Sequence, residues 1–262
     1  MKRLITILSL LLCFIMANAQ GGSLKFLGIP IDGSEARFAS QLKGKGFRYD
    51  ALYECYKGQF NGKNVDVFLH TNHNVVDRVY VSFPYTSEEG IRVEYNTLLT
   101  QFKENGKYAD LVLNKQIPEE DDISYEMSVH NKRYQASFCY FDPDRAPTSF
   151  METLVDRLSD FFSEDQKRIL KRYASNLDDY PADQQEALRE QMMLEWLVSD
   201  KMQHPDDEQS SERAIQLLSK ALNEMQSLAD GSVWFMIHEH YGRYSIGLYY
   251  DNLHNQAHGE DL

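Results

Sequence analysis

The dipeptide Asn61-Gly62 constrains the fold of this 262-residue chain more than any other local feature. Asparagine and glycine both tolerate positive φ, so the pair favours a two-residue turn between antiparallel strands. The flanking segments, 53–60 and 63–70, have strand-like composition, and apolar residues alternate along the second. A β-hairpin is therefore predicted at this point.

The same alternation recurs in other parts of the chain. Residues 75–83 continue the meander, because Val79, Val81 and Phe83 share one face of an extended segment. A second hairpin is predicted over 125–140. A closing hairpin is predicted from 233–240 and 244–250, joined by a turn at Tyr241-Gly242.

Helices are predicted between these strands. Ser34 is placed to begin a short helix that ends near Gly44, and Thr86 with Glu89 forms a capping box for a longer one. Several amphipathic stretches follow Pro143. The fold class is therefore α+β, an antiparallel meander and hairpins with segregated helices. We expect the closing hairpin to extend the sheet begun at 125–140, with the helices inserted between them.

The first nineteen residues have the pattern of a secretory signal peptide. Lys2 and Arg3 precede an apolar run over 4–16, and Ala17-Asn18-Ala19 offers small residues for cleavage before Gln20. The apolar run is shorter than the roughly 20 residues of a membrane-spanning helix. A periplasmic or secreted protein with no membrane span after cleavage is expected.

The remaining chain divides by pattern into three parts. We predict an N-terminal α+β unit over 20–115, a C-terminal α+β unit with a helical insertion over 116–250, and a polar tail over 251–262. No internal sequence repeat is visible.

The net charge of −13 excludes some partner classes. Nucleic-acid binding needs clustered lysine and arginine, and an acidic surface is repelled by phosphate backbones. An anionic membrane surface is disfavoured for the same reason. Oligomeric state cannot be read from composition.

Two cysteines, Cys55 and Cys139, remain once the leader is removed. An even pair in an oxidising compartment favours a disulfide, provided that the two strands bring the Cα atoms within about 7 Å. The alternative is two buried thiols, since free cysteine is among the most buried residue types.

Histidines are the most suggestive residues for catalysis. His238 and His240 are separated by two positions on a predicted strand, so both imidazoles point the same way. With a third ligand from the tail they are a candidate zinc or copper site of a metal-dependent hydrolase. The competing interpretation is a polar or partly buried strand end. No other cofactor is predicted.

Tyrosines gather near the last hairpin and near the cysteines. Tyrosine on an exposed sheet face suits carbohydrate or protein binding. The alternative is a sheet stabilised by cross-strand aromatic pairs.

Short motifs near both ends of the chain carry a resemblance to other proteins. FLGIPIDG at 26–33, KGF at 45–47 and FNG at 60–62, with YYDN at 249–252 and GEDL at 259–262, resemble a group of uncharacterised secreted proteins of Bacteroidetes. That group implies no activity or catalytic residue. The order of a helix followed by a meander is also similar to the small α+β units of outer-membrane assembly lipoproteins and β-lactamase inhibitor proteins, which implies a fold only.

The sequence contains no GxSxG motif and no glycine-rich phosphate loop. Together with the leader and the aromatic strands, this favours an exported binding or interaction module of the cell envelope over an enzyme. An envelope protein or a glycan is the expected partner. The alternatives are the metal-dependent hydrolase and a carbohydrate-binding protein.

Overall fold

The computed structural model describes residues 23–110, 114–142 and 223–256, with a few isolated positions between 164 and 220. Contacts divide the chain into two compact units, one formed by Met1–Gln20 and Pro143–Leu228, the other by Gly21–Asp142 and Ala229–Leu262. The predicted signal peptide and most of the helices predicted after Pro143 lie outside the described residues. Within the described residues, no helix combines the length and apolar character that crossing a membrane requires.

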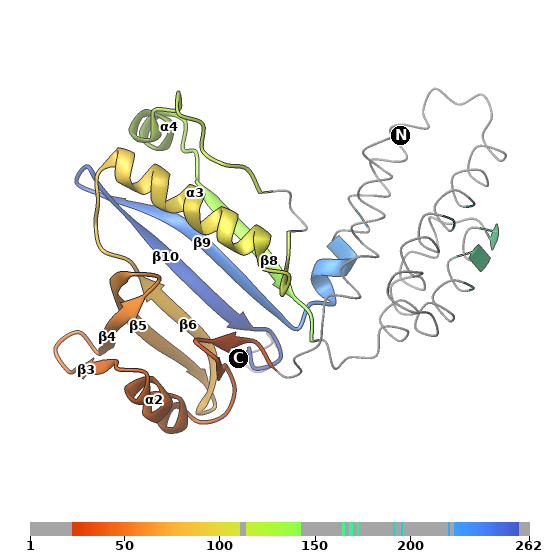
Figure 1. Cartoon of the computed structure of the whole chain (residues 1–262), viewed down its shortest axis with the longest axis horizontal. Coiled ribbons are helices and arrows are strands. Elements are labelled where there is room, and N and C mark those ends of the chain that lie inside the picture. Colours follow the sequence, from red (N-terminus) through yellow and green to blue (C-terminus); the bar gives the residue numbers. More distant parts are fainter. Residues whose placement is uncertain are drawn as a thin grey trace. The chain divides into compact units, whose positions relative to one another are not determined.

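The second unit contains a two-stranded and an eight-stranded antiparallel sheet, together with three helices, and confirms the α+β class (Figure 1). The strand order in the larger sheet is β3-β4-β5-β6-β10-β9-β8-β7. The elements are β1 (Lys25–Phe26), β2 (Ile29–Pro30), α2 (Glu35–Gly44), β3 (Arg48–Asp50), β4 (Cys55–Phe60), β5 (Lys63–Asn72), β6 (Val75–Ser82), α3 (Glu88–Glu104), β7 (Tyr108–Ala109), α4 (Ile123–Val129), β8 (Gln135–Tyr140), β9 (Gly231–His240) and β10 (Arg243–Asn252).

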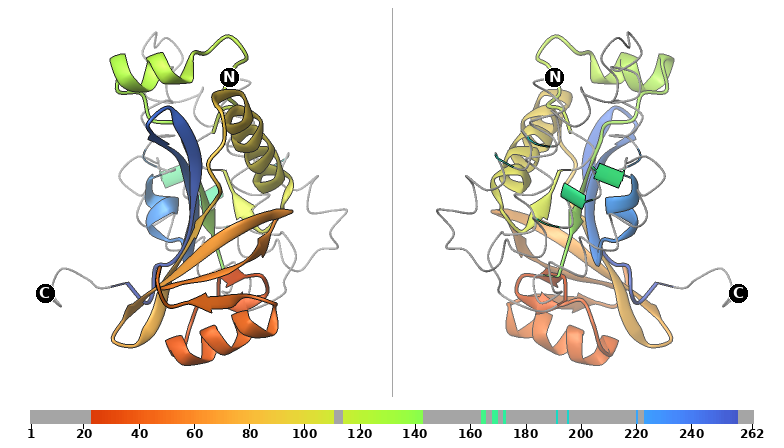
Figure 2. Two further views of the ribbon diagram at one scale, coloured as in Figure 1. Left: turned by 90° about the vertical axis from the view of Figure 1, so that its left-hand side faces the viewer. Right: turned by 90° about the vertical axis from the view of Figure 1, so that its right-hand side faces the viewer.

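The larger sheet uses one arrangement twice. Helix α2 precedes the meander β3 to β6, helix α3 precedes the meander β7 to β10, and the halves join through antiparallel β6 and β10. Figure 2 shows that the sheet is twisted, with the strands of the first half inclined to those of the second. The units predicted over 20–115 and 116–250 therefore share one continuous sheet.

A long segment replaces one hairpin turn in the second half. In the first half β4 and β5 are joined by Asn61-Gly62, whereas residues 141–230 connect the equivalent strands β8 and β9. Strand β8 nevertheless pairs with β9 from Gln135↔Met236 to Tyr140↔Gly231. The predicted joining of the closing hairpin to the sheet begun near residue 135 is thus confirmed.

The predicted tight turns are present. Asn61 and Gly62 have φ of 50° and 74°, and Tyr241 and Gly242 have φ of 50° and 71°. Both dipeptides therefore have the left-handed conformation that a two-residue hairpin of this type requires.

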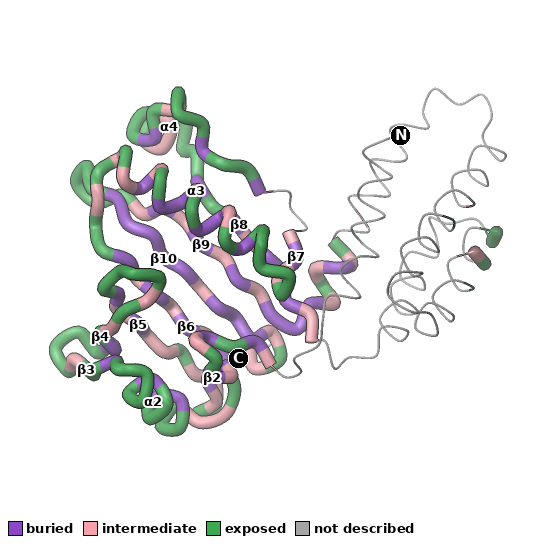
Figure 3. The backbone as a smooth tube through the Cα atoms, viewed as in Figure 1, coloured by how far each residue is buried: buried purple, intermediate pink, exposed green. Residues whose placement is uncertain are grey.

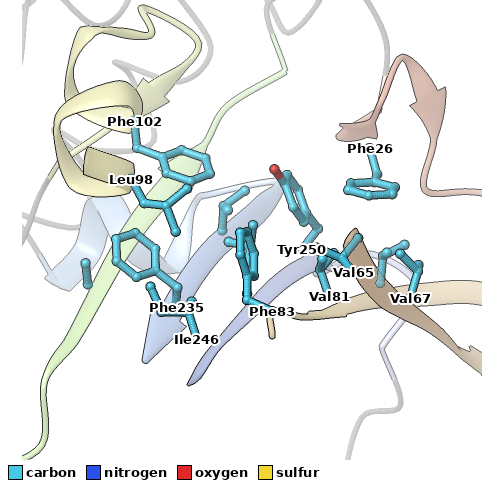
Figure 4. Close-up of a cluster of buried hydrophobic side chains, with 14 of the residues drawn as sticks. Phe26, Val65, Val67, Val81, Phe83, Leu98, Phe102, Phe235, Ile246 and Tyr250 are labelled. Atoms are coloured by element: carbon cyan, nitrogen blue, oxygen red, sulfur yellow. The ribbon is translucent and has the colours of Figure 1, made fainter. Parts of the chain in front are cut away.

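The core lies between one face of the sheet and helices α2 and α3. Helix α3 crosses β8, β9 and β10, and its buried stripe includes Leu98 and Phe102 (Figures 1 and 4). These side chains meet Phe235 of β9 and Ile246 of β10, both fully buried. Along β9 and most of β6 buried and half-buried residues alternate, whereas the central strand β10 is buried over most of its length (Figure 3).

The strand predicted at 125–129 is wrong, because these residues belong to helix α4. The Asp122 side chain accepts a hydrogen bond from Tyr125 N at 2.8 Å and caps the helix. The alternating apolar residues Tyr125 and Val129 are exposed, whereas Ile123 and Met127, four positions apart, pack on the core. The four-residue spacing of the buried side chains, and not the two-residue alternation, therefore decides that this segment is helical.

The tail predicted to begin at residue 251 starts inside strand β10. Asp251 and Asn252 are buried, and the Asn252 side chain donates to Ile31 O at 2.7 Å. Beyond the strand, His254 Nε2 lies 2.7 Å from Asp230 Oδ1. Residues up to at least Asn255 are therefore tied to the sheet by side-chain hydrogen bonds.

Candidate functional site

The larger sheet has two chemically different faces. On β9, Val233, Phe235 and Ile237 are buried in the core, while the intervening Trp234 and Met236 are half-buried and point the other way. We call this second face the outer face. It is formed by the side chains of β3 to β6 and β8 to β10 that alternate with the core residues.

Four aromatic side chains form a row across the outer face. Phe68, Tyr80, Tyr249 and Trp234 come from the adjacent strands β5, β6, β10 and β9, and each lies directly opposite the next in the register. Ring centroids are 5.4, 4.7 and 3.8 Å apart in that order, with interplanar angles of 24°, 19° and 7°. We call this the aromatic row. Its rings stack face to face, so the two inner rings turn their edges rather than their faces to solvent.

A buried carboxylate holds one side of the aromatic row. Asp251 accepts hydrogen bonds from Arg78 Nε at 2.5 Å, from Arg78 Nη2 at 3.1 Å and from Trp234 Nε1 at 2.8 Å. The bond to Asp251 raises the pKa of Arg78, so the guanidinium stays charged. Trp234 is consequently fixed by a stacked ring on one side and by a hydrogen bond at its indole nitrogen.

Burial also affects the ionisation of the row. Desolvation raises the pKa of Tyr249 to about 12, so its hydroxyl is neutral at physiological pH. A neutral row of rings next to a compensated Arg78–Asp251 pair is an apolar strip with little local charge.

Glycine makes room for a histidine beside the row. A Cβ at Gly247 would lie 2.7 Å from His238 Nε2 and 3.0 Å from Tyr80 Cε2, so the imidazole rests against the β10 backbone. His238 Nε2 is buried without a hydrogen-bond partner among the described residues. Burial lowers the pKa of His238, which favours the neutral imidazole.

The candidate metal ligands His238 and His240 point the same way, as their spacing predicts. Two tail histidines could supply the expected third ligand. His254 is bonded to Asp230 at the other end of β9, roughly 30 Å from His240 along a ten-residue strand, and His258 lies outside the described residues. Among the described residues no three His, Cys, Asp or Glu side chains are grouped to hold a metal. The metal site stays a prediction, which metal analysis of the purified protein tests.

The predicted disulfide between Cys55 and Cys139 is wrong, and the alternative of two buried thiols holds. Strands β4 and β8 are separated by four others in the sheet, which places the cysteines roughly 24 Å apart at about 4.8 Å per strand. A disulfide needs Cα atoms within about 7 Å. Sequence gives the two strands but not their positions in the sheet.

We expect both thiols to be unreactive in the native protein. Burial raises the pKa of Cys139 to about 12 and also raises that of Cys55, so almost no thiolate is present at neutral pH. Titration with Ellman's reagent should detect neither thiol in the folded protein, and both after unfolding without reductant. The Cys139→Ser variant should lose one of the two, and an unfolded chain in which neither reacts would restore the disulfide.

Three carboxylate–imidazole pairs lie on the described part of the chain. His70 Nδ1 is 2.7 Å from Asp77 Oδ1, His254 Nε2 is 2.7 Å from Asp230 Oδ1, and His130 Nδ1 is 3.2 Å from Glu126 Oε1. Such a carboxylate can orient a histidine base, but nucleophilic catalysis also needs a hydroxyl or thiol on the other ring nitrogen. None of these three imidazoles makes that second hydrogen bond within the residues described.

Charge is nearly balanced on the outer face, in contrast to the chain as a whole. Asp50 pairs with Lys57 at 3.0 Å and Asp251 pairs with Arg78. The charged residues on this face are Arg48, Asp50, Lys57, Asp66, Arg78, Arg243 and Asp251. The four cations and three anions of this face nearly cancel, whereas the whole chain has a net charge of −13.

Comparison with known proteins yields no match, whether by family model, among curated proteins or among solved structures.

The aromatic row was not predicted from the sequence, although the alternation pattern of two of its strands indicates which face its residues occupy. Trp234 and Tyr80 occupy alternate positions to buried residues on their own strands. That alternation places each on the face away from the core, but their neighbours across the sheet depend on strand order. The tyrosines noted near the last hairpin contribute only Tyr249 to the row.

Proposed function

We propose that this chain is an exported, non-catalytic binding module of the cell envelope that docks a protein partner on its outer face. The aromatic row carries the proposal. It places four stacked, half-buried rings on adjacent strands, in a neutral strip of an otherwise acidic chain. Aromatic residues are enriched at protein interfaces because they supply large contact area with few rotatable bonds.

The geometry of the row favours a protein over a sugar. A sugar binds aromatic residues by stacking on an exposed ring face, and both faces of Tyr80 and Tyr249 are covered by neighbouring rings. Ring edges remain available, and these suit the side chains of a protein surface. Carbohydrate binding is therefore the weaker alternative.

Rigidity supports binding as well. The Trp234 indole nitrogen donates to a carboxylate that Arg78 also holds, so the row has one arrangement before a partner arrives. A preformed surface loses less side-chain entropy on association.

The test is co-purification from the native envelope with a variant of the row. Phe68→Thr combined with Tyr80→Thr removes the two rings that β5 and β6 contribute to the aromatic row. Threonine is β-branched and therefore suits the strands. We expect a protein recovered with the wild type to be lost with this variant. The matched control is Val93→Thr, which changes an exposed apolar residue on helix α3, and it should retain the partner.

Two results would contradict the proposal. One is equal recovery of the same partner by the row variant, provided that its urea midpoint shows that it folds. The other is recovery of the intact chain, still beginning at Met1, from the cytosol, since export would then fail; N-terminal sequencing of the envelope fraction should begin at Gln20.

A further inference from the structure

A cluster of exposed side chains lies where β9 turns into β10. Tyr241 is 91% exposed and Tyr85 is 48% exposed. The His240 ring lies between them, with centroids 4.4 Å from Tyr241 and 6.3 Å from Tyr85. The Arg243 guanidinium carbon is 5.8 Å from the Tyr85 ring centroid. We call these four residues the tip cluster.

The tip cluster is held in place by its surroundings. Glu239 Oε1 accepts from Gly242 N at 2.6 Å and so closes the turn. Backbone bonds between Thr86 and Tyr244, at 2.7 and 3.0 Å, fix the segment that carries Tyr85 against β10. Arg243 Nη2 in turn donates to Tyr85 O at 3.3 Å. An exposed aromatic group on a fixed turn is a preformed contact surface.

Two features of the tip cluster oppose stability. Tyr241 has φ of 50°, a conformation that disfavours a large side chain where asparagine or glycine would fit, and its exposed ring gains almost no burial in return. His240 and Arg243 are direct cross-strand partners, so two basic side chains face each other. Neither forms an ion pair with a described carboxylate, and the nearby Glu239 is engaged by Gly242 N. An anionic ligand would relieve the second cost.

We propose that the tip cluster binds a carboxylate-bearing segment of a protein partner, with Arg243 and His240 contacting the carboxylate and Tyr241 covering the adjoining apolar atoms. His240 and Arg243 lie on the same outer face as the aromatic row, so the two surfaces are continuous along β9 and β10. The inference rests on the proposed function for its choice of a peptide. Arg243 is suited to this role because its planar donors match a carboxylate in pairs.

Capped tripeptides test this inference without the natural partner. The acidic probe is acetyl-Glu-Leu-Asp-amide and its neutral match is acetyl-Gln-Leu-Asn-amide, each titrated into the ¹⁵N-labelled protein. We expect the acidic peptide to shift the amide signals of Tyr241 and Gly242 and the side-chain Nε–H of Arg243. The neutral peptide should leave them unchanged, and added salt should weaken the acidic one.

Variants separate a binding site from a passive surface. Arg243→Gln should weaken the acidic peptide at least about tenfold, the scale of a lost charge-assisted pair. Arg48→Gln, an exposed arginine at the far edge of the same face, should leave it unchanged. Tyr241→Asn should raise the melting temperature, because asparagine tolerates the turn, and yet weaken binding.

Equal shifts with both peptides, or unchanged affinity in Arg243→Gln, would overturn the inference. So would a lower melting temperature in Tyr241→Asn, since the turn would then not be strained. Binding of a glucuronic acid disaccharide with no response to the acidic peptide would assign the cluster to a glycan instead. These readouts are independent of partner recovery, so the row could fail as a docking surface while the tip cluster still bound acidic peptides.

Discussion

Replacing Phe235 with alanine is expected to destabilise the chain by about 3–5 kcal/mol, the range for truncating a buried phenylalanine. Phe235 is fully buried in the centre of the core, where its ring meets Tyr95 at 5.1 Å, Phe102 at 5.9 Å and Phe138 at 6.5 Å between centroids. Alanine leaves a cavity between β9 and α3 that rigid strands cannot fill. The measurement is the urea midpoint, followed by near-ultraviolet circular dichroism.

The neighbouring residue supplies the control. Trp234 directly precedes Phe235 on β9, but its side chain points to the outer face and is half-buried. Trp234→Ala should therefore cost less stability than Phe235→Ala, and it should weaken partner recovery more than its loss of stability explains. If the two variants shifted the midpoint equally, the outer face would be a second core rather than a surface.

Local chemistry was enough to predict most of the secondary structure. Asn61-Gly62 adopts positive φ as its composition favours, and Gly242 does so at the last turn, although Tyr241 takes the same conformation against the preference of a large side chain. Strand β5 beside the first turn alternates as predicted over Val65 to Phe68. Ser34 precedes helix α2 as expected, while Ser87 rather than Thr86 caps helix α3, accepting from Gly90 N at 3.2 Å. These features depend on residues only a few positions apart, which is why a single sequence reveals them.

Long-range pairing lies beyond that reach. The central pair of the aromatic row, Tyr80 and Tyr249, is separated by 169 positions, and their contact exists only because β6 pairs with β10. The disulfide prediction failed for the same reason, since Cys55 and Cys139 lie on strands whose places in the sheet no local pattern encodes. The halves of the sheet also repeat in topology and not in sequence, so no internal similarity could indicate it.

Side-chain bonds to the backbone also escape prediction. Asn114 donates to Ser137 O at 2.8 Å and accepts from Ser137 N at 3.0 Å, so an amide side chain takes the place of a neighbouring strand along β8. Asn96 of α3 bonds both backbone groups of Ile117 in the same way. These asparagines cover polar backbone that would otherwise stay open to pairing with another chain.

Replacing Asp251 with alanine should destabilise the chain by about 2–3 kcal/mol, less than the cost of breaking a fully buried pair because Arg78 is partly exposed. Three hydrogen bonds end on this carboxylate, two from Arg78 and one from Trp234. Alanine leaves the guanidinium and the indole nitrogen without their acceptor. The loss should appear in the urea midpoint and in altered tryptophan fluorescence as the Trp234 ring loosens. Asp66→Ala, a half-exposed acid on the same face, is the control and should change stability little.

A second variant separates the two roles of Asp251. Arg78→Met combined with Asp251→Leu removes both charges and fills the space, and replacing a buried ion pair by apolar residues commonly restores stability. Stability should therefore recover in the double variant, while Trp234 still lacks its hydrogen bond. If the ion pair serves mainly to orient the aromatic row, partner recovery stays reduced even in the restabilised protein. Full recovery of both stability and partner binding in the double variant would show that Asp251 stabilises the sheet and that stacking alone positions the indole ring.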